Sequence, residues 1–253
     1  FTSESPVRTE VLTQRALQRN MTGNLMDNLG FVSPGVNVQV DCGVCVTNNV
    51  RINGMEGPYT AVLIDGTPVM SALASVYGFN GLHPALIEQV EIIRGPLSTL
   101  YGSEAMGGVL NIVTKDPRLA PRFALNSFVT SDGETNVDAA VTPHLGRARV
   151  LLSGTLARND RFIDRDPDGF TDLPLVNRAS LFGKLGLGSA DQRRLDLTTR
   201  WYREERFGGT ADWTRADLGS DQVYGEFITT ERAELIGNWR LPVASDALRL
   251  WFS

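Results

Sequence analysis

Four segments of the chain alternate apolar and charged residues, and this alternation constrains the fold more than any other feature. They are Arg147–Ala157, Arg178–Gly188, Arg194–Arg203 and Arg232–Leu241. Because residues two apart lie on the same face of a strand, each segment would present one apolar and one charged face. Strands of about ten residues with this pattern are typical of outer-membrane barrels, although a soluble sandwich alternates in the same way.

The connections around these segments alternate in length, which favours the barrel. The short ones are Thr142–Gly146, Ser189–Gln192 and Pro242–Asp246, and the long ones are Arg158–Val176 and Glu204–Thr230. Barrels have short periplasmic turns and longer extracellular loops, whereas two such long loops would count against a compact soluble domain. Trp201 and Trp239 are expected near strand ends, at the membrane interfaces. We predict that residues 118–253 form six antiparallel transmembrane strands and the start of a seventh.

The composition argues against two other classes. Because no apolar run of roughly 18 residues occurs, we expect no transmembrane helix. The net charge of −5 argues against a general nucleic-acid binder, which would carry a basic stripe. The chain begins at Phe1 without the basic and apolar regions of a signal peptide, so we expect that any such peptide has been removed or lies outside this sequence.

The first part of the chain, up to about Lys115–Pro117, mixes helix and strand signals. Apolar residues recur every four positions at Leu17, Met21, Leu25 and Leu29, which predicts short helices with one apolar face. One helical turn is predicted at Pro84–Glu88. Strands are predicted at Val36–Val40, Val50–Ile52, Val62–Ile64, Val90–Ile93 and Val109–Thr114. Residues 1–117 are therefore predicted to be a small α+β domain.

Several stretches of this domain together carry a specific resemblance to a known family. They are Arg51–Gly54, Thr60–Val69, Ile87–Pro96 and Leu100–Lys115. Their order and spacing resemble the plug domain of TonB-dependent receptors over roughly residues 6–117, a far longer match than any short motif. The predicted fold class is thus an α+β plug domain followed by antiparallel transmembrane β-barrel strands. The barrel is expected to be incomplete, because family barrels have about 22 strands.

The resemblance implies a location and a set of partners. The plug would block a barrel in the outer membrane, with the plug side facing the periplasm, and substrate would bind from outside. A TonB-type inner-membrane energy-transducing complex would then pull on the N-terminal segment, although no TonB box is recognised in Phe1–Val11. The expected partners are this complex, outer-membrane lipid and a metal chelate or other small nutrient, with no nucleic acid.

The resemblance also suggests functional residues in the plug. Its apices should be outward loops, and Asn53–Tyr59 and Ser71–Gly81 fit that description. The candidate substrate contacts are Met55, Glu56, Tyr59, Tyr77 and Phe79. The same residue types could equally pack against barrel loops. Arg94 and Glu104 are expected to be buried between plug and barrel wall, where ions need partners, and to lock the two together.

Cys42 and Cys45 form a C-x-x-C pair in a polar loop. A short-loop disulfide in an oxidising compartment is the favoured interpretation. A structural zinc site would need further ligands, and a thioredoxin-like redox motif would lie between a strand and a helix.

The first long loop resembles the start of a calcium loop, because carboxylates occupy alternate positions before Gly169. The candidate ligands are Asp164, Asp166, Asp168 and Asp172. However, Leu175 stands where the bidentate glutamate is expected, and Pro167 restricts the turn. A solvated acidic loop is the alternative, and no cofactor is required.

No catalytic constellation is recognised, and we do not expect an enzyme. His83 and His144 are the only histidines, and neither lies beside a nucleophile motif. The leading hypothesis is energy-coupled uptake of a scarce nutrient, first a ferric siderophore, with cobalamin, haem or a glycan as alternatives. Two further hypotheses are a plug-fold binding or signalling module without transport, and a thiol–disulfide enzyme that uses Cys42 and Cys45.

Overall fold

The computed structural model describes residues 8–17, 25–40, 48–69, 86–188, 194–243 and 246–252. Their contacts divide the chain into two compact units. The first comprises the described residues up to Ala120 together with residues 250–252, and the second runs from Pro121 to Arg249. No helix among the described residues is long and apolar enough to cross a membrane.

The first unit is built on a five-stranded sheet with the strand order β1-β6-β7-β4-β5. The strands are β1 (Arg8–Thr13), β4 (Thr60–Ile64), β5 (Thr67–Pro68), β6 (Ile87–Arg94) and β7 (Gly108–Thr114). β4 and β7 pair in parallel, and the other neighbours are antiparallel. Val90, Ile92 and Leu110 are completely buried, because alternate residues of each strand face the core.

Short helices and a hairpin complete this unit, which confirms the predicted α+β class. Leu17, Leu25 and Leu29 are all completely buried, so the four-residue apolar period gives the buried face of two helices. The remaining elements are α1 (Gln14–Leu17), α2 (Leu25–Val32), α4 (Ser98–Tyr101), the 3-10 turns η1 (Gly57–Tyr59) and η3 (Ser103–Ala105), and the hairpin of β2 (Val36–Val40) with β3 (Asn48–Ile52).

The helical turn predicted at Pro84–Glu88 is confirmed only at Leu86, which has 3-10 conformation, and is wrong for the two residues that follow it. Ile87 and Glu88 belong to β6, and Ile87 is opposite Thr114 of β7. Ile87 is completely buried, so its burial in the sheet outweighs the weak helix signal after Pro84.

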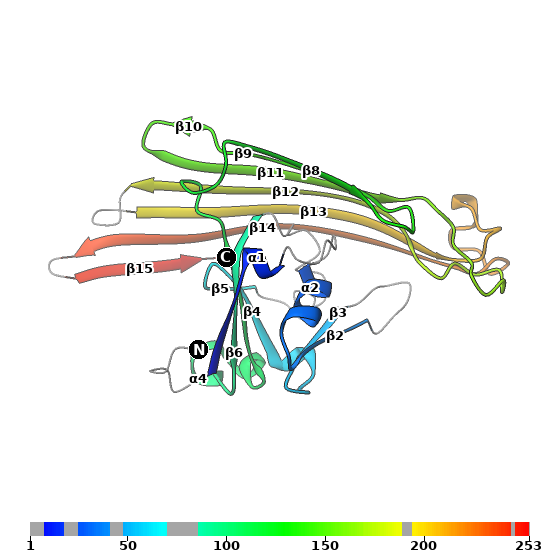
Figure 1. The fold of residues 1–253 in the computed structure, drawn as a ribbon, viewed down its shortest axis with the longest axis horizontal. Helices are drawn as coiled ribbons and strands as arrows, with labels where there is room; N and C mark the ends of the chain where they lie inside the picture. Colours follow the sequence, from blue (N-terminus) through cyan, green and yellow to red (C-terminus); the bar gives the residue numbers. More distant parts are fainter. Residues whose placement is uncertain are drawn as a thin grey trace. The chain divides into compact units, whose positions relative to one another are not determined.

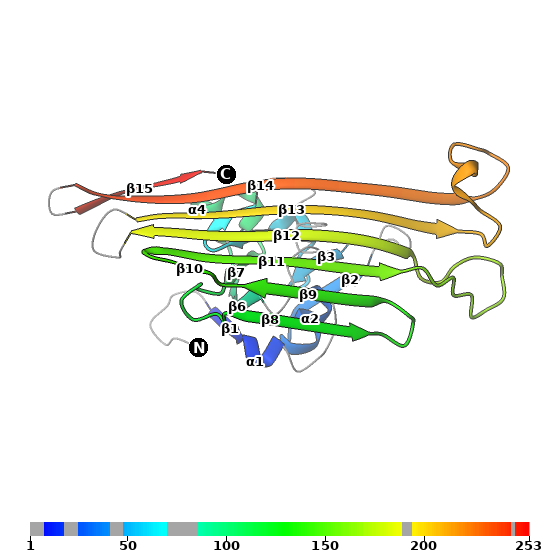
Figure 2. The ribbon, with the colours of Figure 1, turned by 90° about the horizontal axis from the view of Figure 1, so that it is seen from above.

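The second unit is an antiparallel sheet with the order β15-β14-β13-β12-β11-β9-β8, and β10 pairs with β11. The strands are β8 (Phe123–Val129), β9 (Thr135–Val141), β10 (His144–Leu145), β11 (Ala148–Asn159), β12 (Leu175–Gly188), β13 (Arg194–Gly209), β14 (Gly225–Val243) and β15 (Asp246–Phe252). The long strands β11 to β14 lie side by side (Figure 1). The two long connections, residues 160–174 and 210–224, lie at the same end of the sheet (Figure 2). The predicted alternation of short and long connections is therefore confirmed.

The strands are longer than the sequence pattern predicted. β13 continues to Gly209 and β14 begins at Gly225, so much of the loop predicted at Glu204–Thr230 is strand. Trp201 consequently lies in the middle of β13 and not near its end. The reason is that Arg203–Arg206 interrupts the apolar alternation, while the backbone ladder between β13 and β14 continues without a shift.

The two faces of this sheet differ as predicted. One face exposes apolar side chains: Leu152, Leu156, Leu181, Leu187, Leu235 and Trp239 are each about half exposed. Toward the long loops this face becomes polar, at Arg158 on β11, Arg203 on β13 and Glu231 on β14. An apolar band with a polar border is the arrangement expected of strands that face lipid.

Candidate functional site

Three candidate substrate contacts lie in one tight turn between β3 and β4. The backbone N–H of Met55 donates to the carbonyl of Ile52 at 3.1 Å, and that of Tyr59 donates to Glu56 at 3.0 Å. The Tyr59 carbonyl in turn accepts a hydrogen bond from Gly107 N–H at 2.8 Å. The turn is therefore fixed to the segment before β7, with Glu56 and Tyr59 exposed. Tyr77 and Phe79 lie outside the described residues, as do Cys42 and Cys45.

Arg94 joins distant segments of the first unit. Its Nη2 pairs with Glu10 Oε2 at 2.6 Å and donates to Ser33 Oγ at 2.9 Å and to the Pro34 carbonyl at 2.6 Å. Its Nη1 donates to Asn53 Oδ1 at 3.1 Å. The Arg94 side chain is 8% exposed, so these contacts compensate the cost of burying its charge.

The Arg94 cluster thus links β1, the turn after α2 and the turn after β3. These partners were not anticipated from the sequence, because they lie 41 to 84 residues from Arg94. Glu104 lies in η3 and is exposed. The predicted role of Arg94 and Glu104 as a lock between plug and barrel wall stays a prediction.

Replacing Gly35 by alanine is expected to disturb the Arg94 cluster. Gly35 has φ +84°, and a Cβ there would lie 2.5 Å from Arg94 Nη1. Gly54 has nearly the same φ, +83°, but open space around it. Both alanine variants should lose about 1–3 kcal/mol of stability to backbone strain. Only Gly35→Ala should lose further stability, because its new Cβ clashes with Arg94. Thermal unfolding of the two variants measures the difference, and equal losses would contradict this account.

A second polar group fixes the turn between β4 and β5. The Asp65 carboxylate accepts hydrogen bonds from the backbone N–H and the hydroxyl of Thr114, at 2.8 and 2.7 Å. Gly66 N–H donates to Asn111 Oδ1 at 2.9 Å, and Asn111 donates to Glu91 at 2.8 Å. The Asp65-Gly66 turn in the motif series is therefore tied to β7 by side chains as well as by the backbone.

The polar face of the second unit carries a network of ion pairs. Arg149 Nη2 lies 3.1 Å from Asp196 Oδ1, and Arg200 Nη2 lies 2.6 Å from Glu234 Oε2. Glu204, whose side chain is 1% exposed, pairs with both Arg178 and Arg206. These contacts join β11 to β13, β12 to β13, and β13 to β14.

Basic side chains outnumber acidic ones on this face. The strand registers place on it Arg149, Arg178, Lys184, Arg194, Arg200, Arg206, Arg232 and Arg240, against Asp138, Asp196, Glu204, Glu226 and Glu234. The face therefore has a positive net charge, which favours anionic molecules in any space that it lines.

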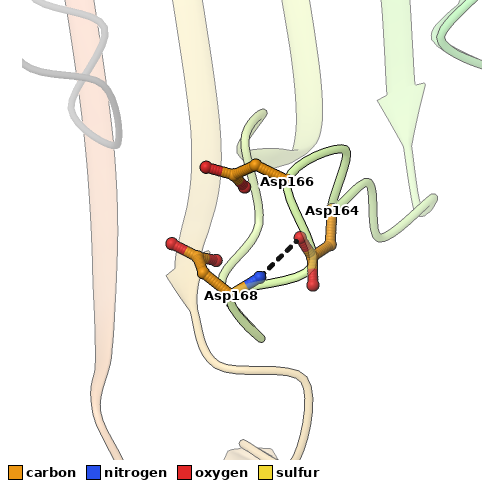
Figure 3. A group of neighbouring side chains, drawn as sticks. All are labelled: Asp164, Asp166 and Asp168. Atoms are coloured by element: carbon orange, nitrogen blue, oxygen red, sulfur yellow. Dashed lines mark hydrogen bonds between the residues drawn. The ribbon is translucent and has the colours of Figure 1, made fainter.

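The acidic loop brings together three of its four candidate ligands (Figure 3). Carboxylate oxygens of Asp164, Asp166 and Asp168 lie within 4.8 Å of one another. Asp164 also accepts hydrogen bonds from the N–H groups of Asp168 and Gly169, at 3.2 and 2.9 Å. Asp172 is not part of this group, and its Oδ2 instead accepts a hydrogen bond from Arg165 N–H at 2.8 Å.

Residues 2–109 match the family model described as the TonB-dependent Receptor Plug Domain. These residues are a TonB-dependent receptor plug domain. The match covers the Arg94 cluster and the first three segments of the motif series, and it includes the fourth segment as far as Val109. The plug is followed by antiparallel strands that resemble those of TonB-dependent receptor barrels.

Two curated relatives are similar over more than half of this chain. The vitamin B12 transporter BtuB of Vibrio vulnificus is 27% identical over 195 residues, which are 77% of this chain and 32% of the relative. The ferric enterobactin receptor PirA of Pseudomonas aeruginosa is 32% identical over 159 residues, or 58% of this chain and 21% of the relative. This chain therefore spans a third or less of the relatives' length.

A solved structure extends the likeness in fold to nearly the whole chain. A mutant of the ferric enterobactin receptor PfeA from Pseudomonas aeruginosa superposes with a TM-score of 0.73 at 19% identity. The match covers 99% of this chain and 40% of that one. The plug domain and the strands that follow it therefore share the fold of a TonB-dependent receptor.

Proposed function

We propose that this chain belongs to an outer-membrane receptor for energy-coupled uptake of a scarce nutrient. The proposed energy source is a TonB-type inner-membrane complex that acts on the N-terminal side of the plug. The proposed location is the outer membrane, with the plug side facing the periplasm. The plug domain and the apolar band of the β8–β15 sheet support this arrangement.

A ferric siderophore is the proposed substrate class. The observation that carries this choice is the basic excess on the polar face of β11 to β14, because ferric siderophores are commonly anionic and cobalamin is nearly neutral. Two of the similar proteins are ferric enterobactin receptors, whereas another is a vitamin B12 transporter. The candidate contacts Met55, Glu56 and Tyr59 of the plug, with Tyr77 and Phe79, are proposed to meet the same ligand.

Deletion of the gene for the full-length receptor tests this function. Uptake of a radiolabelled ferric siderophore should fall, while uptake of labelled cobalamin should stay at the wild-type level. Loss of cobalamin uptake alone would reassign the substrate. A deletion strain with normal uptake of every nutrient tested would favour a plug-fold binding or signalling module without transport.

We further propose that the loop at Asp164, Asp166 and Asp168 binds calcium. Calorimetric titration of the full-length receptor should show one calcium site with a dissociation constant of about 0.1–1 mM, as in extracellular modules. Asp166→Asn should abolish it. Asp172→Asn is the matched control and should leave calcium binding unchanged, because Asp172 lies outside the group of three aspartates. Unchanged binding in Asp166→Asn would remove the proposal.

A further inference from the structure

The face of the second unit that exposes the apolar band also carries, beyond that band, one polar and one aromatic row of side chains. Arg158, Asn177 and Glu205 are register neighbours across β11, β12 and β13. The next row contains Leu175, Phe207 and Phe227. These registers run without a shift, so both rows lie on the same face as Leu181 and Trp201.

The connection between β13 and β14 folds back over these rows. The Trp213 ring stacks on Phe207 with a centroid distance of 4.0 Å and an interplanar angle of 21°. Phe227 lies next to the stack, and the Arg215 guanidinium lies 5.2 Å from the Phe227 ring centroid. Gly225 makes room for the indole, because a Cβ there would lie 2.5 Å from it.

This loop is held in place by its own hydrogen bonds. Asp217 accepts from the N–H and the hydroxyl of Thr214 at 2.8 and 2.7 Å, which forms a capping box around η4 (Arg215–Asp217). These bonds lower the pKa of the Asp217 carboxyl from its usual value. Thr210 N–H donates to the Tyr224 carbonyl at 3.1 Å. The aromatic stack is therefore preformed, which reduces the entropy lost when a ligand binds.

The rows and the loop line an open cavity of about 430 Å³. Aromatic rings line one part of it, and Arg158, Asp160, Asn177, Glu205, Thr214 and Arg215 line the other. This volume is within the range of pockets for small ligands. The cavity belongs to the second unit alone.

The cations that line the cavity are already paired. Arg158 pairs with Asp160, Arg215 Nη2 pairs with Glu205 Oε2 at 2.8 Å, and Arg206 pairs with the buried Glu204. Cations that are each held by a carboxylate attract neither a free phosphate nor a free metal ion strongly. Donors and acceptors beside flat aromatic faces suit a neutral ring that carries many hydroxyl groups, since its C–H faces pack on the aromatic rings.

The position of the cavity identifies the source of such a ring. It lies where the apolar band ends, on the side of the long connections, so in an outer membrane it would face the sugar layer of the outer leaflet and not the acyl chains. This step rests on the proposed function, because it requires the sheet to lie in that membrane.

We propose that this cavity, between the Trp213 stack and the Arg158–Asn177–Glu205 row, binds a sugar residue of an outer-leaflet glycolipid. The aromatic stack packs against the face of the ring, and Asn177 and Thr214 exchange hydrogen bonds with its hydroxyl groups. This contact anchors the long connections of the receptor to the surrounding leaflet. It is separate from the plug turn proposed to meet the nutrient.

Native mass spectrometry of the full-length receptor tests the proposal. The receptor is released from nanodiscs of phosphatidylglycerol alone or of phosphatidylglycerol with purified lipopolysaccharide. Wild type should retain lipopolysaccharide, and Trp213→Ala and Asn177→Ala should each weaken retention about tenfold. Trp239→Ala is the matched control, because Trp239 lies on the same face at the far end of the apolar band, and it should retain lipopolysaccharide as wild type does.

Each other outcome has a defined meaning. The proposal is overturned if wild type and both pocket variants retain lipopolysaccharide equally. It is also overturned if the wild-type receptor retains phosphatidylglycerol as well as it retains lipopolysaccharide. If the receptor binds the delipidated core oligosaccharide in solution as tightly as intact lipopolysaccharide, the ligand is a free glycan and the glycolipid is ruled out as its source. Should Trp213→Ala fail to fold, Asn177→Ala, which keeps the aromatic stack, decides alone. A receptor that enters neither type of nanodisc contradicts the proposed function instead.

Discussion

Glu204→Gln is expected to lower the free energy of unfolding of the receptor by about 3–5 kcal/mol. The Glu204 side chain is 1% exposed and pairs with Arg178 and Arg206, whose side chains are 13% and 3% exposed. The amide keeps the shape of the side chain but leaves two guanidinium groups close together without the carboxylate between them. Removal of one partner from a buried ion pair costs more than the pair itself contributes, because the remaining charge stays desolvated.

Thermal unfolding of the full-length receptor in detergent measures this effect. Glu231→Gln is the matched control: Glu231 is exposed on the opposite face of β14, where it accepts a 3.3 Å hydrogen bond from Trp201 Nε1. It should cost no more than about 1 kcal/mol. The double variant Glu204→Gln/Arg206→Gln should recover part of the loss, because it removes one of the two like charges. A Glu204→Gln receptor as stable as the Glu231→Gln control would contradict this account.

The segment Arg203–Arg206, which contains Glu204, explains why the sequence predicted the strands but not their full length. Alternation of apolar and charged residues identified β13 as far as Arg203. Arg203, Glu204, Glu205 and Arg206 are then charged on both faces, a pattern that resembles a loop when taken alone. In the structure Glu204 pairs with Arg178 and Arg206 on one face, and Glu205 with Arg203 on the other. Ion pairs within β13 and one ion pair to β12 replace the apolar alternation, and the partner on β12, Arg178, cannot be identified from sequence spacing.

Candidate site residues were predictable to the extent that the chemistry was local. The group of Asp164, Asp166 and Asp168 follows from their spacing within one loop. The aromatic cavity was missed because Phe207 and Phe227 were assigned to a loop, so their register across β13 and β14 was hidden. Thr214 and Asp217 are spaced as in a capping box, and this spacing could have predicted the helical turn in the connection between β13 and β14.

Arg94→Ala is expected to lower the stability of the plug by about 2–3 kcal/mol. The change removes the partner of Glu10, which stays 21% exposed, and it removes donors to Ser33 and Pro34. The cost is smaller than for Glu204 because water can reach the Glu10 carboxylate. Arg118→Ala is the matched control in the same unit: Arg118 is 60% exposed and lies 3.5 Å from Asp116. It should change stability by less than about 1 kcal/mol.

Hydrogen exchange in the full-length receptor distinguishes two explanations of this loss. Glu10 is opposite Ile92 in the β1–β6 ladder, so a role of Arg94 within the plug predicts faster exchange of the β1 amides in Arg94→Ala. A double-mutant cycle with Glu10→Gln should then give a coupling of about 1–3 kcal/mol. If Arg94 acts mainly as a lock against the barrel wall, the β1 amides should stay protected and the coupling should be near zero. The four contacts of Arg94 inside the plug favour the first result. Three of them join the turns after α2 and β3, which the five-stranded sheet does not hold, and the fourth adds a side-chain contact to the pairing of β1 with β6.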